Sequence, residues 1–588
     1  MKMPLVPALL LGRVIGFILY LNPKRRRLAF KNIKSAFPEK SNGELYCIIR
    51  KSFDNLGLSI IEGLIAPRIF KYVQMRGLEN VAQGGVVVGL HEGSWELYNS
   101  SIAQNADYAV LAKKQKKKNI NTFINELRVQ YRVNICFSLK ELMKYIRNNY
   151  LIGMTMDHGA EDNAHLIEFF SHIIPTPRGA VYLAKKFNKK IFPCFGYRTG
   201  ILSHVVEIKT PIETAQKSEK ELLCILNKSY ENDLRKHPAE YLWHYKRFKR
   251  KKDLNIIVLS DGKPGHLKQS LSLLELFSQE DYILRAKTID IQYRNKQSRF
   301  IADLVAILTR KNSIAGIKYL KLLLTPESIS KLSVSFADIV ISTGSLVASV
   351  NRIFASSVGA KSVTILRPNI PVKKFDLSII PEHDRVQSDS ITTIKGALCC
   401  PENIEKKMKE CREFFNLSDS KKISFILGGV LSDKKEFLKN LKSFVPKLKE
   451  FSKTHDYKIL VSTSRRTPKE ADKYLKMELE NFENTEAIVY PNHKNYNFVF
   501  DGFISISDVA FISSESISMV SETLALNKPC VGIVFEKQEG KHKVFLKLLK
   551  NAITLLKPPY RIDEIKPKAS SIFEDNRKTV KAAIKTLF

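Results

Sequence analysis

The chain has 588 residues, of which 44% are hydrophobic, 26% are charged and 10% are aromatic. This length and composition can bury more than one core, so they exclude a single small binding module and an intrinsically disordered protein. The 95 Lys and Arg outnumber the 59 Asp and Glu, giving a net charge of +36, so we expect anionic partners: an acidic carrier protein, a phosphate-bearing membrane surface or nucleic acid.

The eight cysteines include no Cys-x-x-Cys pair and no zinc-like cluster with histidine. A disulfide framework and a zinc site are therefore not expected. We expect a protein that faces a reducing, cytoplasmic compartment and uses neither a metal nor an organic cofactor.

The N-terminus carries a nearly continuous apolar stretch at residues 4–21, followed by four basic residues at 24–27. Basic flanks stay on the cytoplasmic side of a membrane. Arg13 lies within the stretch, and a charge at the bilayer centre costs about 2.5–3.5 kcal/mol. We therefore predict a membrane-anchoring helix over residues 1–22, interfacial or barely spanning, in preference to a cleaved signal peptide. A helix buried against its own domain is the alternative.

Short apolar runs at 85–90 and 151–156 are typical of central strands in an α/β domain. A run rich in Lys and Arg at 245–252 precedes another buried strand at 254–259. The simplest domain boundary lies after this basic run, which gives a first domain over 23–252.

The rest of the chain repeats one pattern, in which a buried strand leads through a turn of small residues into a helix. The runs 337–342 and 507–512 are each followed by such a turn, and each returns through a new apolar run. This repetition predicts two Rossmann-like lobes, over 253–400 and 401–588, with a cleft between them.

A first chemical constellation follows the strand at 85–90. His91 and Glu96 are five positions apart, and on one continuous helix they would point about 140° away from each other. If His91 closes the strand, Gly93 turns the chain and Ser94 caps a new helix, Glu96 can fold back to the imidazole. A carboxylate on one ring nitrogen raises the basicity of the other, which deprotonation of an alcohol requires. A capped turn with an incidental histidine is the alternative.

The first 250 residues resemble the lipid A biosynthesis acyltransferases of the lauroyl/myristoyl type, within the lysophospholipid acyltransferase superfamily. The resemblance is carried by the hydrophobic N-terminus and by residues 27–38, 91–96, 156–157, 169–170, 177–180, 198, 238–243 and 247. It implies an α/β acyltransferase domain at the inner membrane, on its cytoplasmic side. It also implies an acyl thioester of acyl carrier protein as donor and a hydroxyl of a lipid A precursor as acceptor.

Within this resemblance, His91 is the expected general base and Glu96 its orienting partner. Asp157, Arg178 and Arg198 are expected to bind substrate. His158 stands where the family often has Gln, so the acceptor pocket and the acyl length stay open.

Three groups of basic residues have both a functional and a structural interpretation. Arg128, in a helical stretch, is a candidate for steadying a phosphate or the developing oxyanion, or else a solvated helix-face residue. The Lys-rich run at 113–118 suits an acidic carrier protein or lipid phosphates, and the run at 246–252 suits anionic headgroups. Either run can equally be a solvated surface segment.

A second constellation lies in the later lobe, where residues 513–516 (Ser-Ser-Glu-Ser) separate a strand from a helix. Backbone N–H groups, the helix dipole and the hydroxyls there favour an anion, which predicts a diphosphate site. Arg side chains can neutralise a leaving nucleoside diphosphate without a metal. A glycine pair permits close approach of the backbone to the ligand. A Glu about one and a half turns along the helix can reach a ribose hydroxyl. The predicted nucleotide-sugar residues are Gly428, Gly429, Arg465, Arg466, Ser514, Ser516 and Glu522.

Residues 253–588 resemble the Elm-type mitochondrial fission family, which is similar to glycosyltransferases of the GT-B architecture. The resemblance is carried by residues 261–266 with Gln269, 366–369, 464–468, and 514–522 leading to 528–529. It implies that the later lobe holds the nucleotide and that the earlier lobe, with Asp261, Lys263 and His266, faces the acceptor. His266 is a candidate base, with a helix-capping or core role as the alternative.

Together these patterns predict a bifunctional envelope enzyme: an acyltransferase joined to a sugar transferase of the GT-B type, with both acting on a lipid A type glycolipid. Two alternatives stay open, a noncatalytic interaction module in the second half and acylation of a different membrane glycolipid. Nucleic-acid binding is not expected, because no recognition motif accompanies the positive charge.

Overall fold

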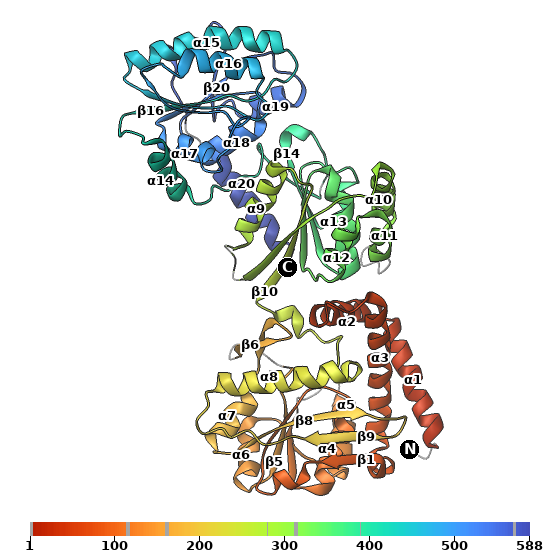
Figure 1. The fold of residues 1–588 in the computed structure, drawn as a ribbon. Helices are drawn as coiled ribbons and strands as arrows, with labels where there is room; N and C mark the ends of the chain where they lie inside the picture. The colour runs from red at the N-terminus through yellow and green to blue at the C-terminus, as the bar shows by residue number, and fades with distance from the viewer. Residues whose placement is uncertain are drawn as a thin grey trace. The chain divides into compact units, whose positions relative to one another are not determined.

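The computed structural model describes residues 4–112, 118–158, 164–278, 280, 282–310, 316–388, 390–568 and 572–587. Most of the Lys-rich run at 113–118 lies outside the described residues. The chain divides into two compact units: Met1–Leu254 with Ser333–Ala337, and Asn255–Leu332 with Asp338–Phe588. Both are α/β, as the sequence predicts (Figure 1).

The first unit is built on a seven-stranded sheet in the order β1-β9-β8-β2-β5-β3-β4. Within it, β2 pairs in parallel with both β5 and β8, and the edge pair of β1 and β9 runs antiparallel to the other strands. The predicted strands at 85–90 and 151–156 are confirmed as β2 and β5. The strand bounds are β1 Val73–Arg76, β2 Gly85–Gly89, β3 Tyr108–Leu111, β4 Asn134–Cys136, β5 Leu151–Thr155, β8 Ile191–Arg198 and β9 His204–Ile208, with β6 His165–Phe169 and β7 His172–Thr176 as a separate hairpin.

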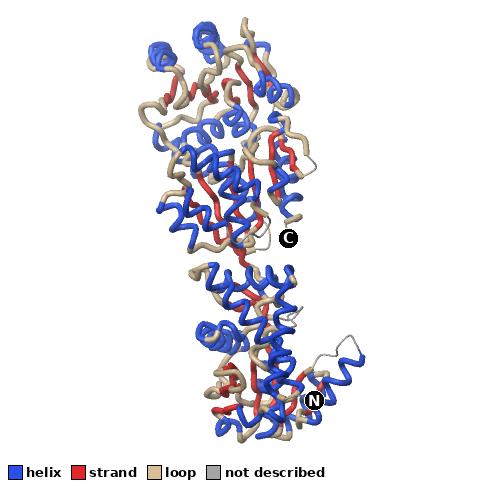
Figure 2. The backbone as a smooth tube through the Cα atoms, turned by 90° about the vertical axis from the view of Figure 1, so that its right-hand side faces the viewer, coloured by secondary structure: helices blue, strands red, loops and turns tan. Residues whose placement is uncertain are grey.

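Side chains alternate along the strands, so apolar residues point to both faces of this sheet. Helices cover both of these faces. Val86 and Val88 join one hydrophobic core, and Val87 between them joins the other. Figure 2 shows strands enclosed by helical layers. The helices are α1 Leu5–Leu21, α2 Pro23–Ala36, α3 Asn42–Leu64, α4 Trp95–Asn105, α5 Lys118–Gln130, α6 Leu139–Arg147, α7 Gly179–Lys186 and α8 Glu219–Lys236.

The N-terminal helix α1 packs on α3 through small residues. Gly12 and Gly16 of α1 are buried, and a Cβ on Gly16 would lie 2.5 Å from the carbonyl oxygen of Phe53. Several large side chains of α1 face outward, among them exposed Leu10, Phe17 and Ile18. No single described helix is long and apolar enough to cross a membrane, although α1 and α2 pass that test as a pair bent by 86°.

The second unit contains two lobes, each with a six-stranded sheet and helices on both faces. The earlier sheet has the order β11-β10-β12-β13-β14-β15 and the later one β18-β17-β16-β19-β20-β21. The pairs that join β10, β12, β13, β14 and β15 are parallel, and so are the pairs that join β16 to β21. This arrangement confirms the two predicted Rossmann-like lobes.

The earlier lobe consists of β10 Asp253–Ser260, α9 Pro264–Ser278, β11 Ile283–Asp290, α10 Lys296–Leu308, α11 Gly316–Leu323, α12 Pro326–Ser333, β12 Ile339–Thr343, α13 Ser345–Val358, β13 Lys361–Ile365, β14 Leu377–Pro381 and β15 Ile391–Ile394. The later lobe consists of α14 Ile404–Phe415, β16 Lys422–Ile426, α15 Lys434–Thr454, β17 Lys458–Ser462, α16 Lys469–Leu479, β18 Thr485–Val489, α17 Val499–Ile506, β19 Val509–Ser513, α18 Ile517–Ala525, β20 Cys530–Ile533, α19 Gly540–Leu548 and β21 Thr554–Leu556.

The last helix, α20 Ile572–Lys585, returns to the earlier lobe. The Asn576 side chain donates to the carbonyl oxygen of Lys395 (2.7 Å) and accepts from its amide (2.9 Å). Figure 1 shows α20 beside α9. The sequence pattern had assigned this segment to the later lobe.

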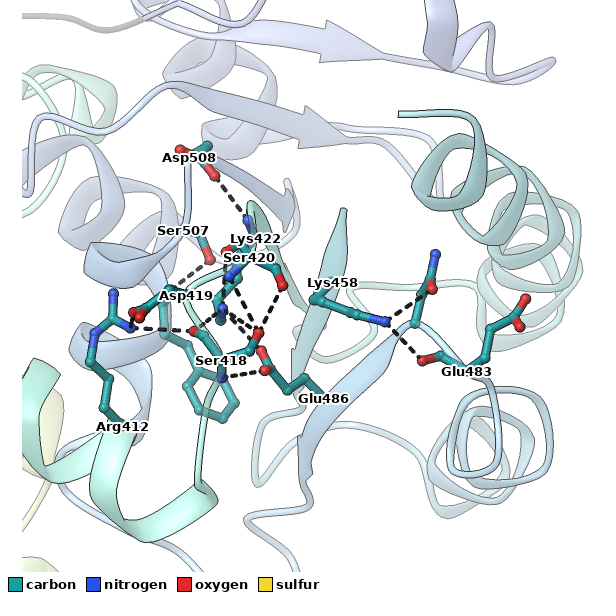
Figure 3. A network of polar contacts seen from close by, with 12 residues as sticks. Arg412, Ser418, Asp419, Ser420, Lys422, Lys458, Glu483, Glu486, Ser507 and Asp508 are labelled. Atoms are coloured by element: carbon teal, nitrogen blue, oxygen red, sulfur yellow. Dashed lines mark hydrogen bonds and ion pairs between the residues drawn. The ribbon is translucent and has the colours of Figure 1, made fainter. Parts of the chain in front are cut away.

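Polar contacts close the amino end of the later sheet (Figure 3). Buried Lys422 opens β16, and its Nζ donates to the carbonyl oxygens of Ser418 (2.5 Å) and Ser420 (3.0 Å) and pairs with Glu486 (3.2 Å). Its amide donates to Asp508 Oδ2 (2.9 Å). These groups hold the amino end of β16, and the glycine pair Gly428–Gly429 follows its carboxyl end.

Candidate active site

The chain turns sharply after β2 and places His91 at the carboxyl end of the strand. Gly93 has φ +49°, and a Cβ there would lie 2.5 Å from the Tyr98 hydroxyl, so the turn requires glycine. Helix α4 begins at Trp95, with Ser94 in the N-cap position but without a capping bond from its side chain. The predicted strand, turn and helix are therefore present.

A buried carboxylate orients the His91 ring. The Asp157 Oδ1 atom lies 2.8 Å from His91 Nδ1, and the His91 amide donates to Asp157 Oδ2 at 3.0 Å. Because an ionised carboxylate only accepts, Nδ1 carries the proton and Nε2 is the basic nitrogen. Among the described residues, no side chain bonds Nε2.

This ion pair changes both pKa values. Burial lowers the pKa of His91, but Asp157 and, more weakly, Glu96 outweigh it, so the pKa lies above its ordinary value. Burial would raise the pKa of Asp157, but the charge and hydrogen bond of His91 hold it below its usual range. The pair is therefore suited to accept a proton at Nε2.

The structure shows Asp157, and not Glu96, hydrogen-bonded to His91, so the orienting role expected of Glu96 stays a prediction. Glu96 lies in the first turn of α4, and its carboxylate pairs with Arg128 of α5. Arg128 Nη2 and Nε donate to Glu96 Oε1 and Oε2 at 2.5 and 3.0 Å. Arg128 is thus engaged by Glu96 rather than being free for a phosphate or an oxyanion, and the two side chains line the same cavity as His91.

His158 stacks on His91, and Tyr245 stacks on the other side of His158. The His158 ring lies 3.7 Å from that of His91, and the Tyr245 ring lies 3.5 Å from that of His158. Burial lowers the pKa of His158 to about 4, so this ring is neutral at neutral pH and does not compete for the proton. The ligand atoms of His91, Asp157 and His158 lie within 4.8 Å of one another, a spacing that metal sites share, but here the first two residues already hydrogen-bond each other.

A cavity of about 500 Å³ opens beside His91. Its polar part contains the Glu96–Arg128 pair, and most of its remaining lining is apolar. An elongated apolar substrate can therefore place one end at Nε2 and bury its chain. The apolar and aromatic lining residues include Trp95, Ile102, Tyr108, Val110, Ile124, Val133 and Met154.

In the later lobe, several predicted nucleotide-site residues meet at the carboxyl ends of β16, β17 and β19. The Gly428 amide donates to Ser513 Oγ (2.7 Å), and Arg466 Nη2 donates to Ser516 Oγ (3.4 Å). A Cβ on Gly429 would lie 2.7 Å from Arg466 Cβ. Ser514 is fully buried, and its Oγ has no hydrogen-bond partner in the described part of the chain. Arg465 is exposed nearby.

In the earlier lobe, the three predicted acceptor-side residues lie together after β10. His266 Nδ1 is 2.9 Å from Oδ2 of buried Asp261, and Lys263 Nζ lies 3.5 Å from the same oxygen. The His266 ring covers Gly344, where a Cβ would lie 2.6 Å from its Cε1. This second histidine and aspartate pair also leaves Nε2 as the basic nitrogen.

Comparison with known families covers nearly the whole chain. The family model of bacterial lipid A biosynthesis acyltransferases matches residues 1–250, and that of mitochondrial fission ELM1 matches residues 264–563. The chain belongs to the mitochondrial fission ELM1 family, and its first 250 residues are similar to the lipid A acyltransferases. We call the unit of Met1–Leu254 and Ser333–Ala337 the acyltransferase unit, and the other the ELM1 unit.

Individual relatives match the acyltransferase unit at modest identity. The lipid A biosynthesis acyltransferase of Haemophilus influenzae is 26% identical over 268 residues, covering 41% of this chain and 84% of the relative. The lipid A biosynthesis palmitoleoyltransferase of Escherichia coli is 24% identical over 258 residues, with the same coverage. Among solved structures, the UDP-GlcNAc 2-epimerase of Neisseria meningitidis aligns with a TM-score of 0.32 and 12% identity, covering 57% of this chain and 94% of the epimerase.

Two expected substrate residues of the acyltransferase unit lie outside the cavity. Arg198 is buried, and its Nη2 donates to Glu62 Oε2 (2.6 Å) beneath α3. Arg178 pairs with Glu219 (2.8 Å). Both guanidinium groups are held by acidic residues of the same unit, and neither lines the space beside His91.

In the ELM1 unit, Glu522 differs from its expected role. Its carboxylate pairs with Lys268 Nζ of α9 (2.6 Å), and Lys268 also lies 3.6 Å from Asp501. The residue joins the two lobes, because a cation of the earlier lobe holds its carboxylate. Burial, opposed by Lys268, raises the pKa of Glu522.

Sequence reasoning missed two residues near the two sites, Glu92 and His542, and gave Asp157 a different role. Asp157 was expected to bind substrate and instead orients His91; its position after β5, beside β2, was the available signal. Glu92 accepts from the amides of Leu90 (2.9 Å) and Gly196 (3.4 Å) and holds the turn. His542 of α19 lies near Arg466, and burial, with Lys541 and Arg466, lowers its pKa; no motif marked it.

Proposed function

We propose that the acyltransferase unit transfers an acyl chain from acyl carrier protein to a hydroxyl of a lipid A type glycolipid. One observation carries the proposal: His91 is oriented by buried Asp157 and opens onto a cavity of about 500 Å³ that has both a polar and an apolar part. The match of residues 1–250 to the lipid A acyltransferase family model supports the same acceptor class.

The chemistry follows from the basic nitrogen. His91 Nε2 takes the proton of the acceptor hydroxyl as its oxygen attacks the thioester carbonyl. The tetrahedral intermediate collapses with cleavage of the carbon–sulfur bond, and the imidazolium returns the proton to the departing thiolate. Asp157 stabilises the imidazolium between these steps. The acyl chain lies in the cavity, and the Glu96–Arg128 pair borders its polar part.

We place the reaction at the cytoplasmic side of the inner membrane. The exposed apolar side chains of α1 fit the interface of a bilayer, and the basic residues at 24–27 fit its anionic headgroups. The net charge of +36 also favours an acidic carrier protein.

For the ELM1 unit, we propose transfer of a sugar from a nucleotide-sugar donor. Support comes from the meeting of Gly428, Ser516 and Arg466 at the carboxyl ends of parallel strands, where phosphates bind in open α/β sheets. His266, held by Asp261, is the base for an acceptor hydroxyl. A noncatalytic interaction module remains the competing function.

Acylation is tested with the purified full-length chain, an acyl-loaded carrier protein and a lipid A precursor, with products measured by mass spectrometry. The intact chain adds one acyl group to the precursor. His91→Ala lowers the rate by at least about 100-fold, while the control His455→Ala, at an exposed histidine of the ELM1 unit, retains it. Equal rates for His91→Ala and the intact chain would remove the assignment.

Sugar-donor binding is tested separately by calorimetric titration with uridine and other nucleoside diphosphates. Arg466→Ala loses affinity, whereas the control Arg561→Ala, an exposed arginine paired only with Glu564 in the described structure, keeps it. If the intact chain binds none of these nucleotides, the noncatalytic module is the better function.

A further inference from the structure

Helix α10 of the ELM1 unit is inverted relative to an ordinary surface helix. It buries its small residues Ser298, Ala302 and Ala306, which lie four positions apart. Its large residues face outward: Phe300 is 65% exposed, and Leu308 is 79% exposed. A surface helix in contact only with water presents the opposite pattern.

Neighbouring α11 extends this apolar surface. Helices α10 and α11 pack on each other and on α13. Leu320 and Leu323 of α11 are buried, while Tyr319 and Leu322 are exposed. We call the outward side of these two helices the α10–α11 face; its exposed large residues are Phe300, Ile301, Leu304, Ile307, Leu308, Tyr319 and Leu322. A contiguous surface of this kind on a folded domain marks an interaction site.

The charged residues of α10, of α11 and of the chain between them are almost all positive. Residues 296–325 contain six Lys and Arg and one acidic residue, Asp303. The Asp303 carboxylate accepts from the Ser349 hydroxyl of α13 (2.6 Å), so it belongs to the inward side. Lys296, Arg310, Lys318 and Lys321 are exposed. The surface therefore combines large apolar side chains with a cationic surround.

We propose that the α10–α11 face docks onto an anionic lipid bilayer. Large aliphatic and aromatic side chains enter the boundary between headgroups and acyl chains, and the surrounding Lys and Arg contact anionic headgroups. A second copy of the chain would bring the same positive charges against this face, and repulsion would oppose that contact.

The same inverted arrangement occurs in α1 of the acyltransferase unit, where glycines are buried and Leu10, Phe17 and Ile18 are exposed. Each unit thus has its own lipid-binding helix surface. Attachment of the ELM1 unit concentrates it where a lipid-bound substrate is found. The proposal does not depend on sugar transfer, because a noncatalytic ELM1 unit would dock in the same way.

A local probe tests the proposal despite the lipid contact of α1. The full-length Leu308→Trp variant is mixed with vesicles of phosphatidylethanolamine and phosphatidylglycerol, with and without brominated acyl chains, which quench tryptophan only at contact range. The control is Met477→Trp, because Met477 is 72% exposed on α16, in the later lobe. The signal of the native Trp95 and Trp243 is subtracted with the parent chain.

We expect bromination to remove most of the emission added by Leu308→Trp and little of that added by Met477→Trp. The combination of Phe300→Glu with Leu304→Glu should abolish the quenching without changing the circular dichroism spectrum. Equal quenching of the two tryptophan variants on vesicles that bind the chain would overturn the proposal. A dimer in the absence of vesicles that Leu304→Glu dissociates would also overturn it and assign the face to a second copy.

Discussion

His91 and Asp157 are 66 positions apart in the chain, yet Nδ1 of the histidine lies 2.8 Å from Oδ1 of the aspartate. Strands β2 and β5 are parallel neighbours, so the residues that follow them emerge at the same edge of the sheet. The contact combines a buried acid with a partly exposed imidazole and leaves one basic nitrogen facing a cavity. The proposed acyl transfer rests on this arrangement.

Arg128→Met should move the acid limb of the acylation rate to higher pH. Glu96 raises the pKa of His91, and its partner Arg128 lowers that pKa. Removing the guanidinium therefore raises the pKa of His91 further, and more of the base is protonated at neutral pH. The measurement is the pH dependence of kcat/KM, with exposed Arg132→Met as the control. An unchanged limb, or one at lower pH, would show that the ion pair does not act on His91.

Val110→Phe should shift the acyl preference towards shorter chains. Val110 lines the cavity, and a phenyl ring there removes volume that a long chain would occupy. We expect the ratio of kcat/KM for long over short acyl donors to fall by about tenfold or more. The control is Val129→Phe, at an exposed position of α5. The same chain-length profile in both variants would place the acyl chain elsewhere.

Gly16→Ala should loosen α1 from α3. The added Cβ would lie 2.5 Å from the Phe53 carbonyl oxygen, and overpacking of this kind costs about 1–3 kcal/mol. Hydrogen exchange of the α1 amides should therefore accelerate by about fivefold or more. Gly43→Ala is the matched control, since a Cβ there meets only the Ser41 hydroxyl, at 4.0 Å. Identical α1 exchange in the two variants would contradict the close packing of these helices.

Lys268 and Glu522 should couple energetically across the two lobes of the ELM1 unit. Their 2.6 Å contact is partly shielded from water, so a double-mutant cycle with Lys268→Met and Glu522→Gln should give about 0.5–3 kcal/mol of interaction. Calorimetric unfolding of the four full-length proteins supplies the cycle. Strict additivity would mean that the ion pair does not hold the lobes together.

The local patterns of the sequence were sufficient for the architecture. A buried strand followed by glycine or serine and then a helix recurs in this chain, and these segments became β2, β12 and β19 with their following helices. Such patterns work because strand burial and turn chemistry depend on near neighbours. They also marked His91 and the Gly428–Gly429 turn as candidates, while Asp261 and His266 came from the resemblance to the Elm-type family.

Side-chain partners could not be derived in the same way, because they depend on elements distant in the chain. Glu96 was expected to reach back to His91, but Arg128 of α5 donates to both of its carboxylate oxygens. Glu522 was expected to face a ribose, but α9 of the other lobe supplies Lys268. In both cases a long-range ion pair decides the orientation of an acidic side chain.

Helix α10 illustrates a different limit. Its small and large apolar residues form two stripes, and periodicity does not say which one faces the core. Only the packing on α13 shows that Ala302 and Ala306 are inside. The exposed stripe that results is therefore a property of the folded unit.

The pH dependence of acyl transfer by Asp157→Asn tests the central claim most directly. The rate of the intact chain should fall on acidification through a single group with a pKa above that of free histidine, because protonated His91 cannot accept a proton. Asp157→Asn should lower the plateau by about 100-fold or more and move the acid limb to lower pH, since burial then acts on His91 without its carboxylate. A plateau and acid limb equal to those of the intact chain would contradict the account.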